Sequence, residues 1–257
     1  MPPTPFRTRP AVVIVGLLIC VGLIYFRSHV RMFAQTAKAA VRKPASGEYT
    51  VDDRVKEYGE TVRQRLEPDF RRQNIPYPPA KLTMIVLKQE RSLEIHAAGT
   101  DGKFRWIRSY PIMAASGQSG PKLREGDLQV PEGLYRIESL NPNSLYHLSL
   151  RINYPNDFDR AQAAKERREN LGGDIMIHGS NVSVGCVAMG DPAAEDLFVL
   201  AALTGLQNIQ VVLSPQDFRL QPTLPITSTS PAWLKRIYDA IAAELRHYPG
   251  PASVSAQ

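Results

Sequence analysis

The sequence predicts a mainly β fold of the α+β class, in which helices flank a strand-rich centre. Short apolar runs between residues 82 and 107 are separated by turn-forming residues, which is typical of neighbouring strands. Apolar residues recur at every third or fourth position over residues 49–72 and again over 231–247, which predicts an amphipathic helix on each side of the strands. The 257 residues are enough for one domain of about 180 residues with its own core.

Residues 1–33 are predicted to form a membrane anchor or a signal segment. Residues 2–10 carry arginine and no acidic residue, and residues 11–26 are an uninterrupted apolar run. This run is shorter than the ~20 residues that a straight transmembrane helix needs, although flanking side chains can snorkel. Small residues that would suit a cleavage site, at 37–39, lie beyond further arginines, so we favour an uncleaved anchor over a cleaved signal peptide.

Residues 34–79 are predicted to form a basic tether followed by the first amphipathic helix, which ends before the prolines at 76–79. We expect the apolar face of this helix to pack on the strand-rich domain, with a partner-binding helix as the alternative. At the other end of the chain, residues 216–257 are predicted to form a closing helix and a polar tail.

The strand-rich domain is predicted over residues 80–215. Its strands are expected at 82–87, 92–96, 104–107 and 209–213. The first three would form a β-meander. Before the last strand, Asp191 is suited to cap a helix that has Pro192 in its first turn and ends at Gly205.

A histidine and a cysteine in the middle of the chain form a candidate catalytic pair. His178 follows the apolar run 175–177, which is typical of a buried strand, and stands eight positions before Cys186, the only cysteine outside the N-terminal apolar run. Cysteine attacks as the thiolate, and a nearby imidazole can take the thiol proton. Gly185 allows a tight turn that would direct its own N–H and that of Cys186 at a tetrahedral oxyanion. The alternative is that Cys186 is a small core residue and His178 merely ends a strand.

The segment HGSNVSVGCVAM at residues 178–189 resembles the signature of the L,D-transpeptidase (YkuD-type) catalytic domain family, a His-Gly pair followed by Ser/Thr-His-Gly-Cys. Here the spacer is short and Val184 replaces the second histidine, which is similar to the family's YafK-like branch with its pattern close to HGxxxSxGCxxM. The resemblance implies that Cys186 is the nucleophile, that His178 is its base, and that the carbonyl group of Gly179 orients the base.

Two upstream segments extend this resemblance. GQSGPKLREGDLQVPEGLY at residues 117–135 is similar to the family's G-x-K-x-x-G-D-x-x-T-P-x-G-x-Y stretch, and NYPN at 153–156 resembles its YPN segment. The resemblance therefore covers about residues 80–215 and implies that these residues form a YkuD-like β-sandwich.

The resemblance implies a periplasmic cysteine acyltransferase that acts on peptidoglycan stem peptides. Release of a terminal D-amino acid would leave an acyl-enzyme, and an amine acceptor would complete a crosslink or attach an outer-membrane lipoprotein. Water as the acceptor would make the protein a hydrolase or amidase that releases murein-bound lipoprotein, and a non-catalytic murein-binding module is the third alternative. A papain-like protease has its cysteine before its histidine, the reverse of the order here. Substrate-binding candidates are Ser183 and the basic residues Lys122, Arg124 and Arg151.

Composition argues against nucleic-acid and metal chemistry. The formal net charge of +6 is ordinary for this length, and the chain has no aromatic and basic stripe, zinc finger or glycine-rich phosphate loop. A single cysteine outside the apolar run excludes an internal disulfide and a multi-cysteine zinc site. His96 and His147 are expected to be surface or half-buried strand residues, and Asp174 is expected about 13 Å from His178, too far to orient it. We expect no metal or cofactor, and membrane contact only through the N-terminal segment.

Overall fold

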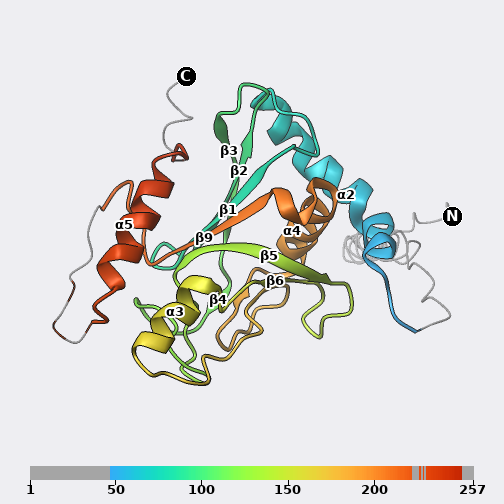
Figure 1. Ribbon diagram of the computed structural model, residues 1–257. Helices are drawn as coiled ribbons and strands as arrows, with labels where there is room; N and C mark the ends of the chain where they lie inside the picture. The colour runs from blue at the N-terminus through green and yellow to red at the C-terminus, as the bar shows by residue number, and fades with distance from the viewer. Residues whose placement is uncertain (1–46, 222–225, 227, 229, 251–257) are drawn as a thin grey trace, which may run out of the picture. The chain divides into compact units, whose positions relative to one another are not determined.

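The computed structural model describes residues 47–221, 226, 228 and 230–250, all of which belong to one compact unit, Pro44–Gln257. Its elements, labelled as in Figure 1, are α2 (Val51–Arg72), β1 (Leu82–Leu87), β2 (Ser92–Ala98), β3 (Phe104–Pro111), β4 (Ala114–Ala115), β5 (Gly133–Asn141), β6 (Ser149–Ile152), α3 (Asp157–Lys165), β7 (Met176–His178), β8 (Val187–Ala188), α4 (Asp191–Thr204), the 3-10 helix η2 (Leu206–Asn208), β9 (Ile209–Ser214) and α5 (Leu234–Leu245). The predicted sheet-dominated domain with flanking helices is therefore confirmed.

The strands form one continuous mixed sheet in the order β3-β2-β1-β9-β5-β6-β7-β8-β4. Neighbouring strands are antiparallel except for two parallel pairs, β1 with β9 and β7 with β8. The predicted meander of β1, β2 and β3 is present. In place of the two separate sheets of a sandwich, the structure has two half-sheets that share β5, whose pairing with β6 shifts register between Ile137 and Ser139. Such an irregularity bends a strand, which lets one sheet curl around a core.

Both half-sheets line a common hydrophobic core that α2 and α4 cover. Phe70 of α2, Phe198 of α4 and Val86 of β1 are fully or almost fully buried in it. A smaller core lies on the opposite face of β1, where Ile85 packs against Ile241 of α5, because successive side chains of a strand point to opposite faces. Figure 1 shows α4 and α5 on the two sides of β1 and β9. The second core does not extend to β7 and β8, so their outer face is left for other contacts.

The predicted helix at 49–72 starts at Val51, because Thr50 caps it and forms a capping box with Asp53. Its buried apolar residues are Val62, Leu66 and Phe70. On the same helix, Arg65 forms an ion pair of 2.7 Å with Asp196 of α4. The helix therefore packs on the strand-rich domain, as the sequence predicts.

The helix predicted at 191–205 is α4, but the prediction that Asp191 caps it was wrong. Gly190 holds the N-cap position and makes no side-chain cap. Asp191 instead accepts the N–H of Ser180 through Oδ1, at 2.7 Å. The start of α4 is thereby tied to the segment that follows His178.

The predicted anchor at 1–33 and the tether at 34–46 lie outside the described residues. Within the part of the chain that the structure describes, no helix is long and apolar enough to cross a membrane. The sequence analysis places α2 in segment 34–79 and α5 in segment 216–257, apart from the strand-rich domain. In the structure both helices belong to the same compact unit as the sheet.

Candidate active site

His178 is the last residue of β7 and is almost completely buried. Its Nδ1 lies 2.6 Å from the carbonyl oxygen of Gly179, the contact that the family resemblance implies. A neutral imidazole in this position donates its Nδ1 proton to that carbonyl and keeps a lone pair on Nε2. The ring of Tyr146 lies against the imidazole with the two centroids 4.7 Å apart, which restricts the tilt of the imidazole. The arrangement presents His178 in the form that a general base needs.

Strand pairing places Cys186 beside β7. In the parallel pair of β7 and β8, Ile177 stands opposite Val187 and His178 opposite Ala188. Ile177 and Val187 are part of the main core. Because side chains alternate along a strand, His178 and Cys186 both belong to the other face. Cys186 lies two residues before Ala188, the residue opposite His178 on the neighbouring strand. This offset places the Cα atoms of His178 and Cys186 about 8 Å apart, a distance that an imidazole and a thiol side chain can bridge.

Burial favours the uncharged form of both members of this pair. Burial lowers the pKa of His178 below its ordinary value. Burial also raises the pKa of the Cys186 thiol, a change that the N–H of Met176 opposes. The negative charge of Asp174 adds to the rise, and the positive charge of Lys122 counteracts it. Both shifts disfavour a resting thiolate and imidazolium, which favours proton transfer during attack over a preformed ion pair.

Asp174 contacts Cys186 through its backbone and not His178 through its carboxylate. The Sγ atom of Cys186 lies 3.6 Å from the carbonyl oxygen of Asp174, which can accept the thiol proton in a weak hydrogen bond. The carboxylate of Asp174 forms an ion pair of 2.7 Å with Arg151. The expectation that Asp174 does not orient His178 agrees with these contacts.

The two backbone N–H groups predicted to bind an oxyanion are both occupied by hydroxyl groups. Gly185, whose φ is +83°, donates its N–H to Oγ of Ser116. Cys186 donates its N–H to Oγ of Ser183 at 3.0 Å, and the same hydroxyl donates to the carbonyl oxygen of Cys186. Buried N–H groups require partners, and small hydroxyl side chains supply them at this tight turn. Ser183 is thereby committed to positioning Cys186, and a substrate oxygen reaches the Gly185 N–H only by displacing Ser116.

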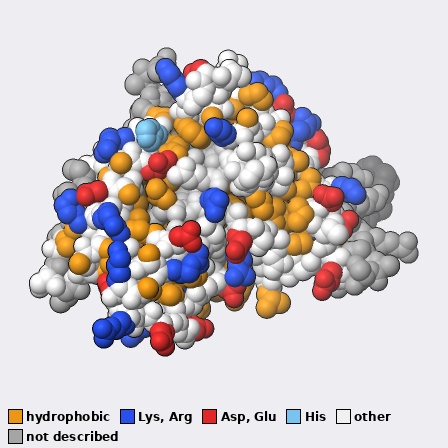
Figure 2. All heavy atoms as spheres, in the orientation of Figure 1, with side chains coloured by type: hydrophobic (Ala, Val, Ile, Leu, Met, Phe, Trp, Pro, Cys, Tyr) orange, Lys and Arg blue, Asp and Glu red, His pale blue; other side chains and the backbone are white. Residues whose placement is uncertain are grey.

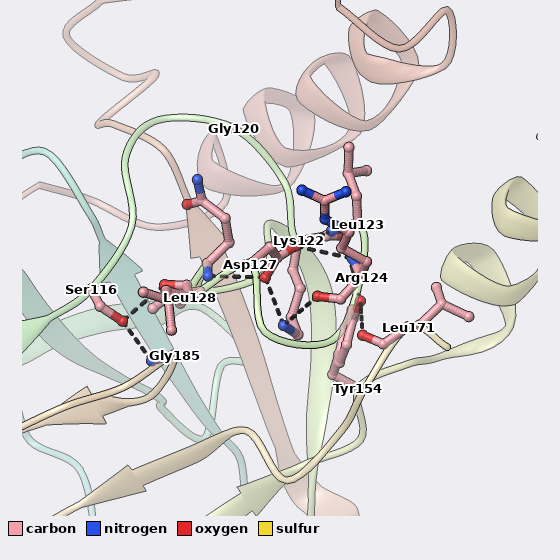
Figure 3. A network of polar contacts seen from close by, with 12 residues as sticks. Ser116, Gly120, Lys122, Leu123, Arg124, Asp127, Leu128, Tyr154, Leu171 and Gly185 are labelled. Atoms are coloured by element: carbon pink, nitrogen blue, oxygen red, sulfur yellow. Dashed lines mark hydrogen bonds and ion pairs between the residues drawn. The ribbon is translucent and has the colours of Figure 1, made fainter. Parts of the chain in front are cut away.

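Lys122 holds together the loop that follows Ser116, whose hydroxyl accepts the N–H of Gly185 (Figure 3). Its buried Nζ lies 2.7 Å from Oδ1 of Asp127 and 3.0 Å from the carbonyl oxygen of Arg124. Burial alone would raise the pKa of Asp127, but the Lys122 ammonium and three backbone N–H groups hold it below its ordinary value. The ammonium group of Lys122 therefore pairs with groups of its own loop. This structural role differs from the predicted binding of a substrate carboxylate.

Arg151 is the basic candidate that the structure brings to the face of the nucleophile. It lies on β6 directly opposite Met176, and Met176 adjoins Cys186 across the next strand pair. Its guanidinium pairs with Glu138 at 2.9 Å as well as with Asp174, and 40% of its side chain is exposed. Arg124 is exposed in the loop closed by Lys122, where its described hydrogen bonds are made by its backbone.

The prediction of a surface or half-buried residue was wrong for His96, and for His147, which is half-buried, only the predicted strand was wrong; neither ring is bonded to the candidate nucleophile. His96 is completely buried on β2, with Nε2 at 2.8 Å from Glu94. His147 lies in a turn with φ of +73°, not on a strand, and its Nε2 is 3.2 Å from Glu195. Among the described residues, no group of three histidine, cysteine, aspartate or glutamate side chains could hold a metal ion.

Sequence reasoning missed Ser116 and Tyr146. Ser116 meets Gly185 across 69 positions of sequence, and Tyr146 meets His178 from a turn that precedes β6. No motif marks either residue in a single sequence, because both contacts arise from the pairing of distant strands.

Gly179→Ala is expected to destabilise the protein by about 1–3 kcal/mol and to lower its activity, because a methyl group here overpacks the site. A Cβ on Gly179 would lie 2.6 Å from Oδ1 of Asp191 and 2.7 Å from the carbonyl oxygen of Tyr146. Thermal unfolding and turnover measure the two effects. The control is Gly59→Ala in α2, whose Cβ meets its nearest atom at 3.8 Å and which should be neutral or stabilising. Wild-type stability and turnover in Gly179→Ala would contradict the described packing.

Residues 84–211 match the family model of the L,D-transpeptidase catalytic domain, YkuD. YafK of Escherichia coli (strain K12), named as a candidate L,D-transpeptidase, is 36% identical over 135 residues, which are 51% of this chain and 52% of that protein. The chain therefore spans about half the length of this curated relative.

Two solved structures are also similar. The helical cell shape determining protein Pgp2 from Campylobacter jejuni is 25% identical over 53% of this chain and 48% of its own, with a TM-score of 0.43. Bd1075 of Bdellovibrio bacteriovorus is 20% identical over 66% of this chain and 56% of its own, with a TM-score of 0.39. The family match covers both the strand that carries His178 and the loop that carries Cys186. Through residues 84–211, this chain belongs to the YkuD family of L,D-transpeptidase catalytic domains.

Proposed function

We propose that the protein is a periplasmic murein L,D-transpeptidase, in which Cys186 transfers an acyl group between peptidoglycan stem peptides. The observation that carries this proposal is the shared face of β7 and β8, with a buried imidazole whose Nδ1 is bound by Gly179 and a partly exposed thiol in the residue that directly precedes β8. The family assignment supplies the reaction class.

In the first half of the proposed reaction, Nε2 of His178 takes the proton from Sγ of Cys186 as the sulfur attacks the carbonyl carbon before the terminal D-amino acid. The oxyanion displaces the Ser116 hydroxyl from the N–H of Gly185, so one hydrogen bond replaces another. Collapse of the intermediate breaks the C–N bond, and the imidazolium returns its proton to the leaving amine. A thioester on Cys186 remains.

In the second half, an amine attacks the thioester carbonyl and gives its proton to His178, and the C–S bond breaks to restore the thiol. A diaminopimelate side chain as acceptor yields a crosslink, whereas a lysine of an outer-membrane lipoprotein yields an attachment. We propose Arg151 for the substrate carboxylate, because it lies on the face of Cys186 and its guanidinium is half exposed. Ser183 and Lys122 would act indirectly, by positioning Cys186 and by closing the loop beside it.

The test is to incubate the full chain with purified murein sacculi, with and without a lipoprotein acceptor, and to assign the products by mass. We expect release of the terminal D-residue to be matched by new peptide bonds, since a bound amine competes well with water at a shielded thioester. Release without new bonds at every acceptor concentration would make the protein a hydrolase, and freed lipoprotein would make it an amidase. Binding of sacculi without any release would leave only a murein-binding module.

A further inference from the structure

A groove apart from the Cys186 site runs over the α5 side of the sheet. Its first part is a hollow of about 660 Å³ between the start of α3 and the strands β1, β5 and β9. A second hollow of about 720 Å³ adjoins it, because Phe104 and Gln210 line both. We call the two hollows together the basic groove. None of the residues lining it is among the proposed catalytic or substrate-binding residues.

The basic groove carries an excess of positive charge. Its cationic residues are Lys81, Lys103, Arg136, Arg160 and Arg246. Its two acids already have partners: Asp157 pairs with Arg160 at 2.8 Å, and Glu244 accepts the hydroxyl of Tyr248 at 2.7 Å. Figure 2 shows lysine and arginine side chains gathered over α3 and α5, with hydrophobic atoms between them. Such a surface concentrates anions.

Two of these cations are available for a ligand. Within the described ranges, the side chains of Lys81 and Arg136 form no ion pair or hydrogen bond, and both residues are exposed. Arg136 of β5 lies directly opposite Gln210 of β9, whose neighbour on the other side is Thr83 of β1. Lys81 lies two residues before Thr83, so the two cations flank Gln210. Two free cations flanking an amide suit a chain that carries carboxylates at intervals.

The remaining lining suits a hydroxylated and acetylated ligand. Gln207 and Gln210 offer amide N–H groups that donate to no other described residue, and half-buried Phe104 and Phe158 give apolar faces. Carboxamides and aromatic faces together bind the hydroxyl, acetamido and ring groups of sugars. Carboxylates on an N-acetylated glycan match both the charge and the lining.

A single polymer can reach both the groove and the proposed active site. Arg136, which lines the groove, lies two residues from Glu138 on β5, about 7 Å along the strand. Glu138 pairs with Arg151, and Arg151 lies on the face of Cys186. The groove therefore leads along β5 to Glu138, and from there through Arg151 of β6 to the face of the sheet that carries Cys186.

We propose that the basic groove is a second, non-catalytic binding site for an N-acetylated glycan bearing carboxylate groups, which is the chemistry of a murein strand with its stem peptides. The choice of this polymer rests on the proposed function. The groove would hold the strand while Cys186 acts on a stem peptide, so it should matter for polymeric substrate and not for an isolated stem peptide.

The test uses the full chain with the paired substitutions Lys81→Gln and Arg136→Gln. The apparent Kd for murein sacculi in co-sedimentation should rise about tenfold, the loss expected when charge-assisted contacts are removed. Turnover of a soluble tetrapeptide should stay unchanged. The matched control, Lys56→Gln with Arg71→Gln, removes the same charge from exposed positions on α2 and should bind sacculi as the wild type does.

Unchanged binding in the groove variant, or equal loss in the α2 control, would overturn the proposal. Sacculi stripped of stem peptides should bind about as weakly as intact sacculi bind the groove variant, and full binding of the stripped glycan would refute the carboxylate assignment. Polyglutamate that competes as well as sacculi would reduce the groove to a general anion site. If the wild type turns over no tetrapeptide while the groove variant alone loses binding, the proposed function fails and the groove proposal stands.

Discussion

Cys186→Ala is expected to abolish release of the terminal D-amino acid, a loss on the order of 10⁶-fold, because no other group in the site can form the acyl-enzyme. The fold should persist. The substitution removes one partly exposed sulfur whose described hydrogen bond is a weak one of 3.6 Å to the carbonyl oxygen of Asp174. Thermal unfolding should therefore shift by no more than about 2–4 °C, the change that corresponds to about 1 kcal/mol. Product release measured by mass gives the first quantity, and circular dichroism gives the second.

The other cysteine of the chain provides the matched control. Cys20→Ala lies in the N-terminal apolar run and should leave turnover unchanged. A carbapenem, which acylates the nucleophile of enzymes resembling this one, should add one adduct to the wild type and to Cys20→Ala but none to Cys186→Ala. Normal turnover in Cys186→Ala, or an adduct that survives in it, would remove the basis for the proposed catalysis.

Strands β1, β2, β3, β7 and β9 and the helices α2, α4 and α5 could be predicted because their signals are local, whereas β4, β5, β6 and β8 were not among the predicted strands. Strand β1 is buried along its whole length and appears as a continuous apolar run, and α2 shows its stripe because only one side of the helix faces the core. Helix α3 was missed for the converse reason. Only Gln162 and Ala163 of that helix are buried, so it has no apolar stripe, although Asn156 and Asp159 form a capping box.

Contacts between residues far apart in the sequence could not be predicted, either for His96 or around the pair His178 and Cys186. His96 alternates like a half-buried strand residue, but the ring of Tyr248 covers it at 5.4 Å between centroids. The N–H of Gly185 is satisfied by Ser116 only because β4 pairs with β8. Local sequence thus indicates the chemistry of Cys186, while the tertiary fold decides which groups are free to assist it.

The resting protonation states have a mechanistic consequence. An enzyme with a preformed thiolate needs its histidine mainly as a counterion. Burial in this site lowers the pKa of His178 and raises that of Cys186, so a preformed ion pair is disfavoured. In the proposed reaction the proton then passes from sulfur to Nε2 during the attack, so we expect the attack step to depend on His178 at neutral pH and to depend on it less once the pH itself ionises the thiol.

His178→Gln should therefore slow acylation of Cys186 by about 10²–10⁴-fold at neutral pH, since glutamine keeps a hydrogen-bonding side chain but cannot accept the thiol proton. The defect should shrink as pH rises. The variant reacts only through its thiolate, whose fraction grows about tenfold per pH unit up to the thiol pKa, and burial raises that pKa above its ordinary value. The wild type should lose activity only on the acid side, where His178 becomes protonated below its own lowered pKa.

Stopped-flow acylation by a carbapenem across the pH range measures both profiles. His147→Gln is the control, because His147 contacts Glu195 in a neighbouring turn and should give a wild-type profile. A defect in His178→Gln that stays constant from neutral to alkaline pH would mean that the residue only maintains the structure, because loss of packing does not depend on the ionisation of the thiol. A defect that narrows toward alkaline pH is the result expected if His178 removes the thiol proton.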